Sequence, residues 1–158
     1  MIDTHCHLYQ EEFKKDIEIV IQDATAIGVK KIFVPGVDAE TSQRSLEIAS
    51  KFPNSVFPMV GIHPNYSSEN KFQIIEELIL SRRNQIIAVG EIGLDYYREF
   101  SPRASQINTF EKMLSLARKF DLPICIHNRD ADKDILSILG NWYSEKVLGS
   151  SKKIAGIF

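Results

Sequence analysis

Six short runs rich in β-branched residues recur along the chain, and amphipathic stretches separate them. Runs of this kind indicate strands, because about four to eight alternating or continuous apolar residues suit a pleated backbone. Strands that alternate with helices form parallel sheets through right-handed crossovers, so the sequence predicts an α/β fold. The runs cover residues 1–8, 30–35, 56–63, 86–94, 123–127 and 153–158.

The stretches between the runs have helical periodicity. Gly28 ends the first as a stop signal, and Ser101 and Pro102 open the fourth as a capping residue and a proline at the first helical position. Asp130 is the expected cap of the last helix. Further helices are expected at residues 38–51, 69–82 and 130–146. The apolar face of the first helix is predicted to contain Phe13, Ile17, Val20, Ile21, Ala24 and Ile27.

Length and composition predict one domain over residues 1–158. The chain has 44% hydrophobic and 25% charged residues, which is enough apolar material for a sizeable core, and it shows no internal repeat or linker. A barrel collects its catalytic groups from the carboxyl ends of several strands, whereas a doubly wound sheet places its site at one switch point. Polar residues at the ends of several runs favour a TIM (β/α)8 barrel, incomplete here with about six strands and five helices.

Charge and targeting signals narrow the class of protein further. The net charge of −2 lacks the basic excess of proteins that hold nucleic acid by their surface, although bound cations can meet a phosphate in an enzyme site. No run approaches the roughly 20 apolar residues of a membrane span, and the first residues do not resemble a signal peptide. We therefore expect no membrane partner, a cytoplasmic location, and free thiols at Cys6 and Cys125.

Histidines and one glutamate stand at the ends of three of the runs. In a strand, the period of two sends His5 and His7 to the same face, where two imidazoles can bind one cation, although a packed histidine pair is an equally good interpretation. Glu91 lies between glycines in an apolar run and needs a cation or a basic partner. His127 ends the fifth run, where a barrel presents metal ligands.

Two further residues are candidates for binding substrate. His63 precedes a proline at the end of the third run and can contact a substrate phosphate or stabilise the turn. The guanidinium of Arg129 suits a phosphate oxygen, or an ordinary ion pair with Asp130 or Asp132.

Taken in order, four motifs resemble the TatD family of metal-dependent deoxyribonucleases. They are THCH at residues 4–7, GIHP at 61–64, VGEIGLD at 89–95 and IHNR at 126–129. The resemblance covers essentially the whole chain and implies a barrel of the amidohydrolase type with two divalent metal ions, Mg, Mn or Zn. It places His5 and His7 on one metal and His127 on the second, with Glu91 as the bridging ligand and catalytic residue. It also implies hydrolysis of DNA phosphodiester bonds by a 3′-5′ exonuclease on single-stranded DNA.

The sequence departs from the family pattern at its C-terminal end. In the family, a histidine ligand follows the sixth strand and an aspartate that acts as general base lies later still, beyond Phe158. A (β/α)8 barrel typically needs about 250 residues. We therefore expect a partial barrel that lacks the last two strand–helix units, with impaired activity unless a complementing C-terminal chain or fragment completes it.

Two alternatives remain open at this point. The first is a metal-dependent hydrolase of the same superfamily that acts on an amide or lactone, because a shared fold does not identify the substrate. The second is a catalytically inactive fragment that serves as an interaction module, which the missing strands favour.

Overall fold

The computed structural model describes residues 1–98, 100–147 and 156–157, and within them six parallel strands form one sheet in the order β1-β2-β3-β4-β5-β6. Strands that follow one another in the chain are therefore neighbours in the sheet, and the order never reverses as it does in a doubly wound sheet. This winding confirms the predicted barrel type of α/β fold. The strands are β1 (Ile2–Asp3), β2 (Lys31–Pro35), β3 (Val56–Val60), β4 (Ala88–Asp95), β5 (Ile124–Arg129) and β6 (Gly156–Ile157).

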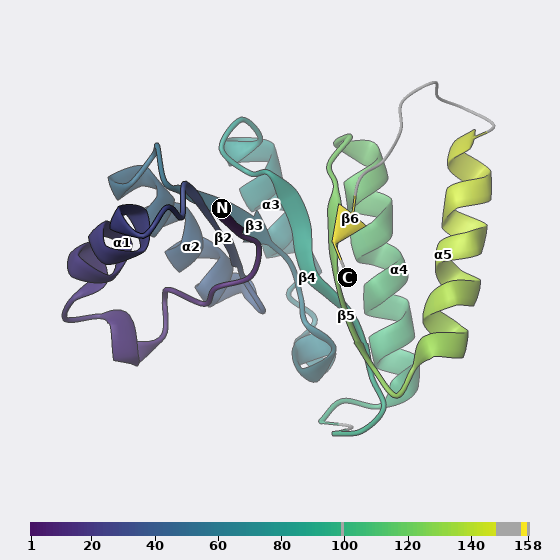
Figure 1. Cartoon of the computed structure of the whole chain (residues 1–158). Coiled ribbons are helices and arrows are strands. Elements are labelled where there is room, and N and C mark those ends of the chain that lie inside the picture. Colours follow the sequence, from purple (N-terminus) through teal and green to yellow (C-terminus); the bar gives the residue numbers. More distant parts are fainter. Residues whose placement is uncertain (99, 148–155, 158) are drawn as a thin grey trace.

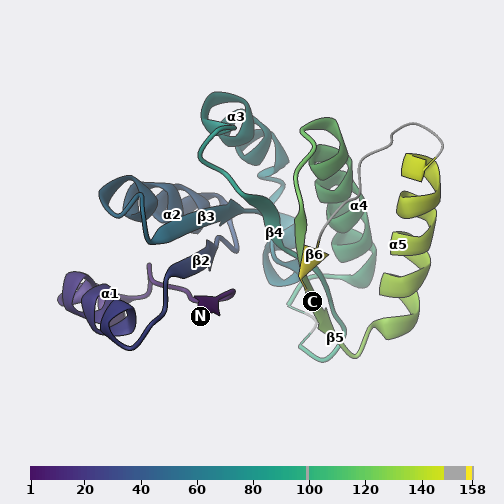
Figure 2. The ribbon, with the colours of Figure 1, turned by 45° about the horizontal axis from the view of Figure 1, so that its top comes forward.

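The helices cover the outer face of a curved sheet whose strands line the inside (Figures 1 and 2). Among the described residues, β1 pairs with β2 alone and β6 with β5 alone, so the arc is open between these two edges. None of the described helices is long and apolar enough to span a bilayer. The helices are η1 (Glu11–Phe13), α1 (Ile17–Ala26), α2 (Ala39–Lys51), η2 (Pro64–Glu69), α3 (Phe72–Arg82), α4 (Arg103–Lys119) and α5 (Asp132–Val147).

Local hydrogen bonds explain where several helices begin. The side chain of Asp38 accepts a hydrogen bond from the backbone N–H of Thr41 at 2.7 Å, and the Thr41 hydroxyl accepts one from Asp38 N at 3.0 Å, which forms a capping box before α2. At α4 the prediction was one residue early, because Pro102 is the N-cap. Ser101 is buried instead and donates its hydroxyl to the carbonyl of Asn65.

Other predicted helix features need correction. The stretch at 69–82 contains the end of η2 and then α3, because Asn70 between them adopts a left-handed φ of 52°. Ile27 follows the last residue of α1 and is 77% exposed, so it is not part of the apolar face. Asp130 does not cap α5 directly, since it adopts a left-handed φ of 56° two residues before that helix.

The two faces of β4 separate the core from the interior of the barrel. Ile92 and Leu94 are fully buried in the main apolar cluster, where they pack with Phe110 and Met113 of α4. Between Val89 and Ile92 the strand contains a bulge: Val89 pairs with Ile124 and Ile92 with Ile126. The extra residue in β4 keeps the side chains of Val89 and Ile92 in the apolar cluster that faces the helices. Glu91 lies between them in the sequence and can therefore face the interior of the barrel.

Candidate metal centre

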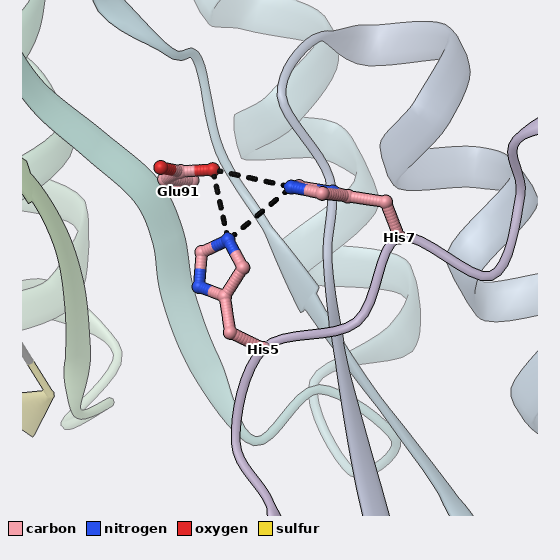
Figure 3. A group of neighbouring side chains, drawn as sticks. All are labelled: His5, His7 and Glu91. Carbon is pink, nitrogen blue, oxygen red and sulfur yellow. Dashed lines mark hydrogen bonds and ion pairs between the residues drawn. The ribbon is translucent and has the colours of Figure 1, made fainter.

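His5 and His7 lie in the segment directly after β1, and not inside a strand as predicted. The segment is nevertheless held beside β2, because Cys6 donates its N–H to the carbonyl of Phe33 at 3.0 Å. The side chain of Asp3 stabilises the beginning of this segment by accepting a hydrogen bond from the backbone N–H of His5 at 3.0 Å. Cys6 packs against the apolar cluster of α1 and β2, while the two imidazoles turn toward β4, with their Nε2 atoms 3.2 Å apart (Figure 3).

Glu91 is 7% exposed and stands between two groups of histidines. Its Oε2 lies 3.2 Å from Nε2 of His5 and 3.7 Å from Nε2 of His7 (Figure 3). Its Oε1 lies 3.0 Å from Nδ1 of His127 and 3.9 Å from Nε2 of His63. In the described part of the chain, its partners are therefore imidazoles rather than the lysine or arginine of an ordinary ion pair.

The carboxyl group of Glu91 is ionised despite its burial. Burial alone would raise its pKa, but hydrogen bonds from His127 and His5 and the nearby His63 outweigh this effect and hold the pKa well below the ordinary value. The buried carboxylate is therefore negatively charged, and each of its two oxygens faces a separate group of imidazole nitrogens.

The spacing of these donors fits bound cations. Two ligand atoms that each lie about 2.0 Å from a tetrahedral ion are about 3.3 Å apart. The Nε2 atoms of His5 and His7 and Oε2 of Glu91 are separated by 3.2, 3.2 and 3.7 Å. The second group, which is His63, Glu91 and His127, has ligand atoms within 4.8 Å of one another. A mixed set of imidazole and carboxylate donors suits zinc or manganese and does not exclude magnesium.

Contacts on the far side of each ring orient the first two histidines. Nδ1 of His7 lies 3.2 Å from the Pro35 carbonyl and 2.6 Å from the Tyr9 hydroxyl, and Nδ1 of His5 lies 3.7 Å from Sγ of Cys125. A proton on each Nδ1 leaves the Nε2 lone pairs directed at the position between His5, His7 and Glu91.

The two imidazoles differ in their affinity for protons. Burial is the main cause that lowers the pKa of His7 below its ordinary value. Hydrogen bonds with Cys125 and Glu91 instead raise the pKa of His5 to about 10. His5 therefore holds a second proton at neutral pH unless a cation takes its place.

Asp95 is a site residue that the sequence reasoning missed. It is 1% exposed, and its Oδ2 lies 3.3 Å from Nε2 of His127. Its Oδ1 accepts the backbone N–H groups of Tyr97 and Arg98 at 3.1 and 2.9 Å. The signal was present in the sequence, because a carboxylate ends the apolar strand that also carries Glu91.

Hydrogen bonds determine both the charge and the place of Asp95. Burial alone would raise its pKa, but the N–H of Arg98 and the bond with His127 outweigh burial and keep the pKa below its ordinary value. The fully buried Gln106 of α4 fixes its backbone, since its side chain accepts Asp95 N at 2.9 Å and donates to the Asp95 carbonyl at 3.0 Å.

His63 reaches the same cluster from the turn before η2. It is 8% exposed, and its Nδ1 accepts the backbone N–H of Asn65 at 3.2 Å. Burial, followed by the nearby His127, lowers the pKa of His63 to about 4, so the ring is neutral at pH 7. With Nδ1 as an acceptor, the single proton is on Nε2, which faces Glu91. In this tautomer His63 is a hydrogen-bond donor toward the centre, so Glu91 and His127 are the members of the second group that offer lone pairs to a cation.

Arg129 is the last residue of β5, and its guanidinium packs against an aromatic ring. Its Cζ lies 4.0 Å from the ring centroid of Tyr97. The alternative ion pair with Asp130 or Asp132 is absent among the described residues, whose ion pairs involve other side chains.

The expected free thiols are confirmed for both cysteines.

A parallel sheet wound as a barrel, with imidazoles and carboxylates gathered toward the carboxyl ends of its strands, is typical of the metal-dependent hydrolases of the (β/α)-barrel class. The family model described as "TatD related DNase" matches residues 2–155. The chain therefore belongs to the TatD family, as its four motifs indicated.

Individual relatives agree with this assignment. The chain is 37% identical over 152 residues to the "Uncharacterized metal-dependent hydrolase YabD" of Bacillus subtilis, covering 94% of this chain and 58% of the relative. It is 34% identical over 143 residues to the "3'-5' ssDNA/RNA exonuclease TatD" of Erwinia tasmaniensis, covering 90% and 55%. The crystal structure of the TatD homologue YJJV from Escherichia coli has a TM-score of 0.83 at 30% identity, covering 90% and 56%. The chain thus spans little more than half the length of these relatives.

Proposed function

We propose that the chain supplies the metal-binding part of a phosphodiesterase that removes nucleotides from the 3′ end of single-stranded DNA or RNA. The observation that carries the proposal is the placement of Glu91, whose two carboxylate oxygens face two separate groups of histidines. A carboxylate so placed suits a bridge between two divalent ions. The substrate class is supported by relatives named as 3′-5′ ssDNA/RNA exonucleases.

Each site residue has a distinct role in this activity. His5 and His7 would hold one ion, His127 would hold the second, and Glu91 would be a ligand of both. Two such ions, when bound, neutralise phosphate charge and lower the pKa of water. His63 donates its Nε2–H to a phosphate oxygen, which agrees with its protonated Nε2, and Arg129 binds a second phosphate oxygen through its guanidinium.

We also propose an extent for the domain. Residues 1–158 form one (β/α)-barrel domain with an open arc, and a closed eight-stranded barrel takes two further strand–helix units, from a longer chain or from a complementing one. Such units would also cover the open strand edges, which otherwise invite pairing with other chains.

The test compares phosphodiesterase activity with the alternative hydrolase activities. The chain, alone and extended to the length of its relatives, is incubated with Mn²⁺, Mg²⁺ or Zn²⁺ and a 5′-labelled single-stranded oligonucleotide. We expect the extended chain to shorten the oligonucleotide stepwise from the 3′ end, and the chain alone to be impaired. EDTA should abolish this activity, and Glu91→Gln should reduce it at least 100-fold. Glu111→Gln, which changes an exposed glutamate of α4, is the matched control. Hydrolysis of lactones or amides without cleavage of the oligonucleotide would overturn the proposal.

A further inference from the structure

An exposed tyrosine is stacked on an arginine beside the candidate metal centre. Tyr97 is 65% exposed, although the guanidinium Cζ of Arg129 lies 4.0 Å from its ring centroid. The arginine thus holds the ring while most of the side chain faces solvent. A large aromatic side chain kept rigid and accessible in this way is suited to stacking with another flat group.

The strand geometry places this pair one step beyond the metal centre. His127 and Arg129 are two residues apart on β5, so their side chains share one face and lie about 6.6 Å apart along the strand. Asp95 and Arg129 are paired in register across β4 and β5. Part of a ligand that extends from the metal centre toward the carboxyl ends of β4 and β5 would therefore contact Arg129 and Tyr97 next.

One carboxylate connects Tyr97 to the metal centre. Asp95 accepts the backbone N–H of Tyr97 through Oδ1 at 3.1 Å, and its Oδ2 is 3.3 Å from Nε2 of His127. Asp95 is 1% exposed, and its backbone is hydrogen-bonded to the side chain of Gln106, so its carboxylate is held in one position. The position of Tyr97 is thus tied to the position of a candidate metal ligand.

We propose that Tyr97, backed by Arg129, is a binding site for the nucleobase of a nucleotide whose phosphate lies at the metal centre. The inference rests on the proposed function and adds to it a source of affinity and strand selectivity. Every base offers a flat face, so stacking on Tyr97 tolerates any sequence. Bases inside a duplex have no free face, so the site selects single strands.

The charge of the chain favours such a contact. A net charge of −2 provides no general attraction for a polyanion, so affinity for a nucleic acid must come from local contacts. Stacking of a base on one aromatic side chain is equivalent to roughly 5- to 150-fold in affinity. Tyr97 supplies the ring for that contact, and Arg129 adds a positive charge beside it.

The test uses two labelled oligonucleotides, an oligo(dT) and the same strand with abasic sites at its last three positions. Their binding to the full chain is measured by fluorescence anisotropy with Ca²⁺. We expect Tyr97→Ala to weaken binding of oligo(dT) about 5- to 150-fold and to leave the weaker binding of the abasic strand unchanged. Tyr97→Phe should retain the wild-type affinity. The matched control is Tyr143→Ala, which removes a ring of α5 that is 57% exposed.

The outcomes separate this proposal from the proposed function. Equal losses for both strands in Tyr97→Ala, or no loss for either, would overturn the nucleobase site. If 3′ cleavage still depends on Glu91 in that case, the proposed function stands without the site. If the wild-type chain binds neither strand, the nucleobase site is also refuted, whatever the cleavage assay shows.

Discussion

The imidazole of His127 lies between two carboxylates. Oε1 of Glu91 is 3.0 Å from its Nδ1, and Oδ2 of Asp95 is 3.3 Å from its Nε2. A carboxylate behind a ligating histidine fixes the tautomer and the ring orientation and makes the ligand nitrogen more basic. Asp95 is therefore a positioning residue for His127: with a cation at the centre, the ring would keep its Nε2–H toward Asp95 and offer Nδ1 to the cation.

Replacement of Asp95 tests this role. Asp95→Asn keeps the size of the side chain but removes the charge behind His127, so we expect Mn²⁺ or Zn²⁺ to bind about 10- to 100-fold more weakly in calorimetric titrations. The ¹⁵N NMR signal of the His127 Nε2–H, observed with Zn²⁺ bound, should shift because its partner is no longer charged. Asp23→Asn on the exposed surface of α1 is the control. Unchanged metal affinity and an unchanged Nε2–H signal would contradict the assignment.

Glu91→Gln tests whether one carboxylate serves both groups of histidines. Because the anionic oxygens face His5 and His7 on one side and His127 on the other, the neutral amide should weaken both positions together. We expect elemental analysis after dialysis against zinc to show two ions per wild-type chain and fewer than one in the variant. Retention of one full equivalent would show that the two groups bind independently.

Metal binding should release protons. Hydrogen bonds with Cys125 and Glu91 raise the pKa of His5 to about 10, so the metal-free ring is protonated below that pH and a cation has to displace the proton. Metal affinity should therefore rise with pH between 7 and 9, by up to about tenfold per unit for one proton. Calorimetry in two buffers of different ionisation enthalpy counts the protons released. An affinity that does not change over this range would contradict the prediction.

Gly93 is required at a close approach of β4 to β5. Its φ is +144°, and a Cβ would lie 2.0 Å from the carbonyl oxygen of His127. Gly93→Ala should therefore reduce the free energy of unfolding by at least about 2 kcal/mol, measured by urea denaturation. Gly140→Ala provides the opposite case. Gly140 lies inside α5, and a Cβ built there meets nothing within 4 Å beyond the helix's own backbone. Because alanine is more favourable than glycine inside a helix, this variant should be more stable by about 0.5–1 kcal/mol. Similar effects of both changes would refute the steric argument.

Much of the fold could be predicted because it depends on local patterns. The strands at 31–35 and 124–129 and the helix α2 lie within about two residues of the predicted ranges, since periodicity and the Asp38 cap are properties of neighbouring residues. The predicted strand at 1–8 was too long, because pairing with β2 stops at Asp3. Residues 153–155 and 158 of the sixth predicted strand lie outside the described residues, and β6 covers Gly156–Ile157.

The sequence by itself determined the order of elements and the kinds of side chain at their ends, because hydrophobic periodicity and motif spacing are written along the chain. Only the tertiary structure decided which of these side chains meet. Glu91 faces His5 because β1 and β4 are held in one curved sheet and a bulge turns the glutamate inward. The contact of Asp95 with His127 likewise depends on the register of β4 and β5, which comes from hydrogen bonds between distant residues and leaves no local pattern in the sequence.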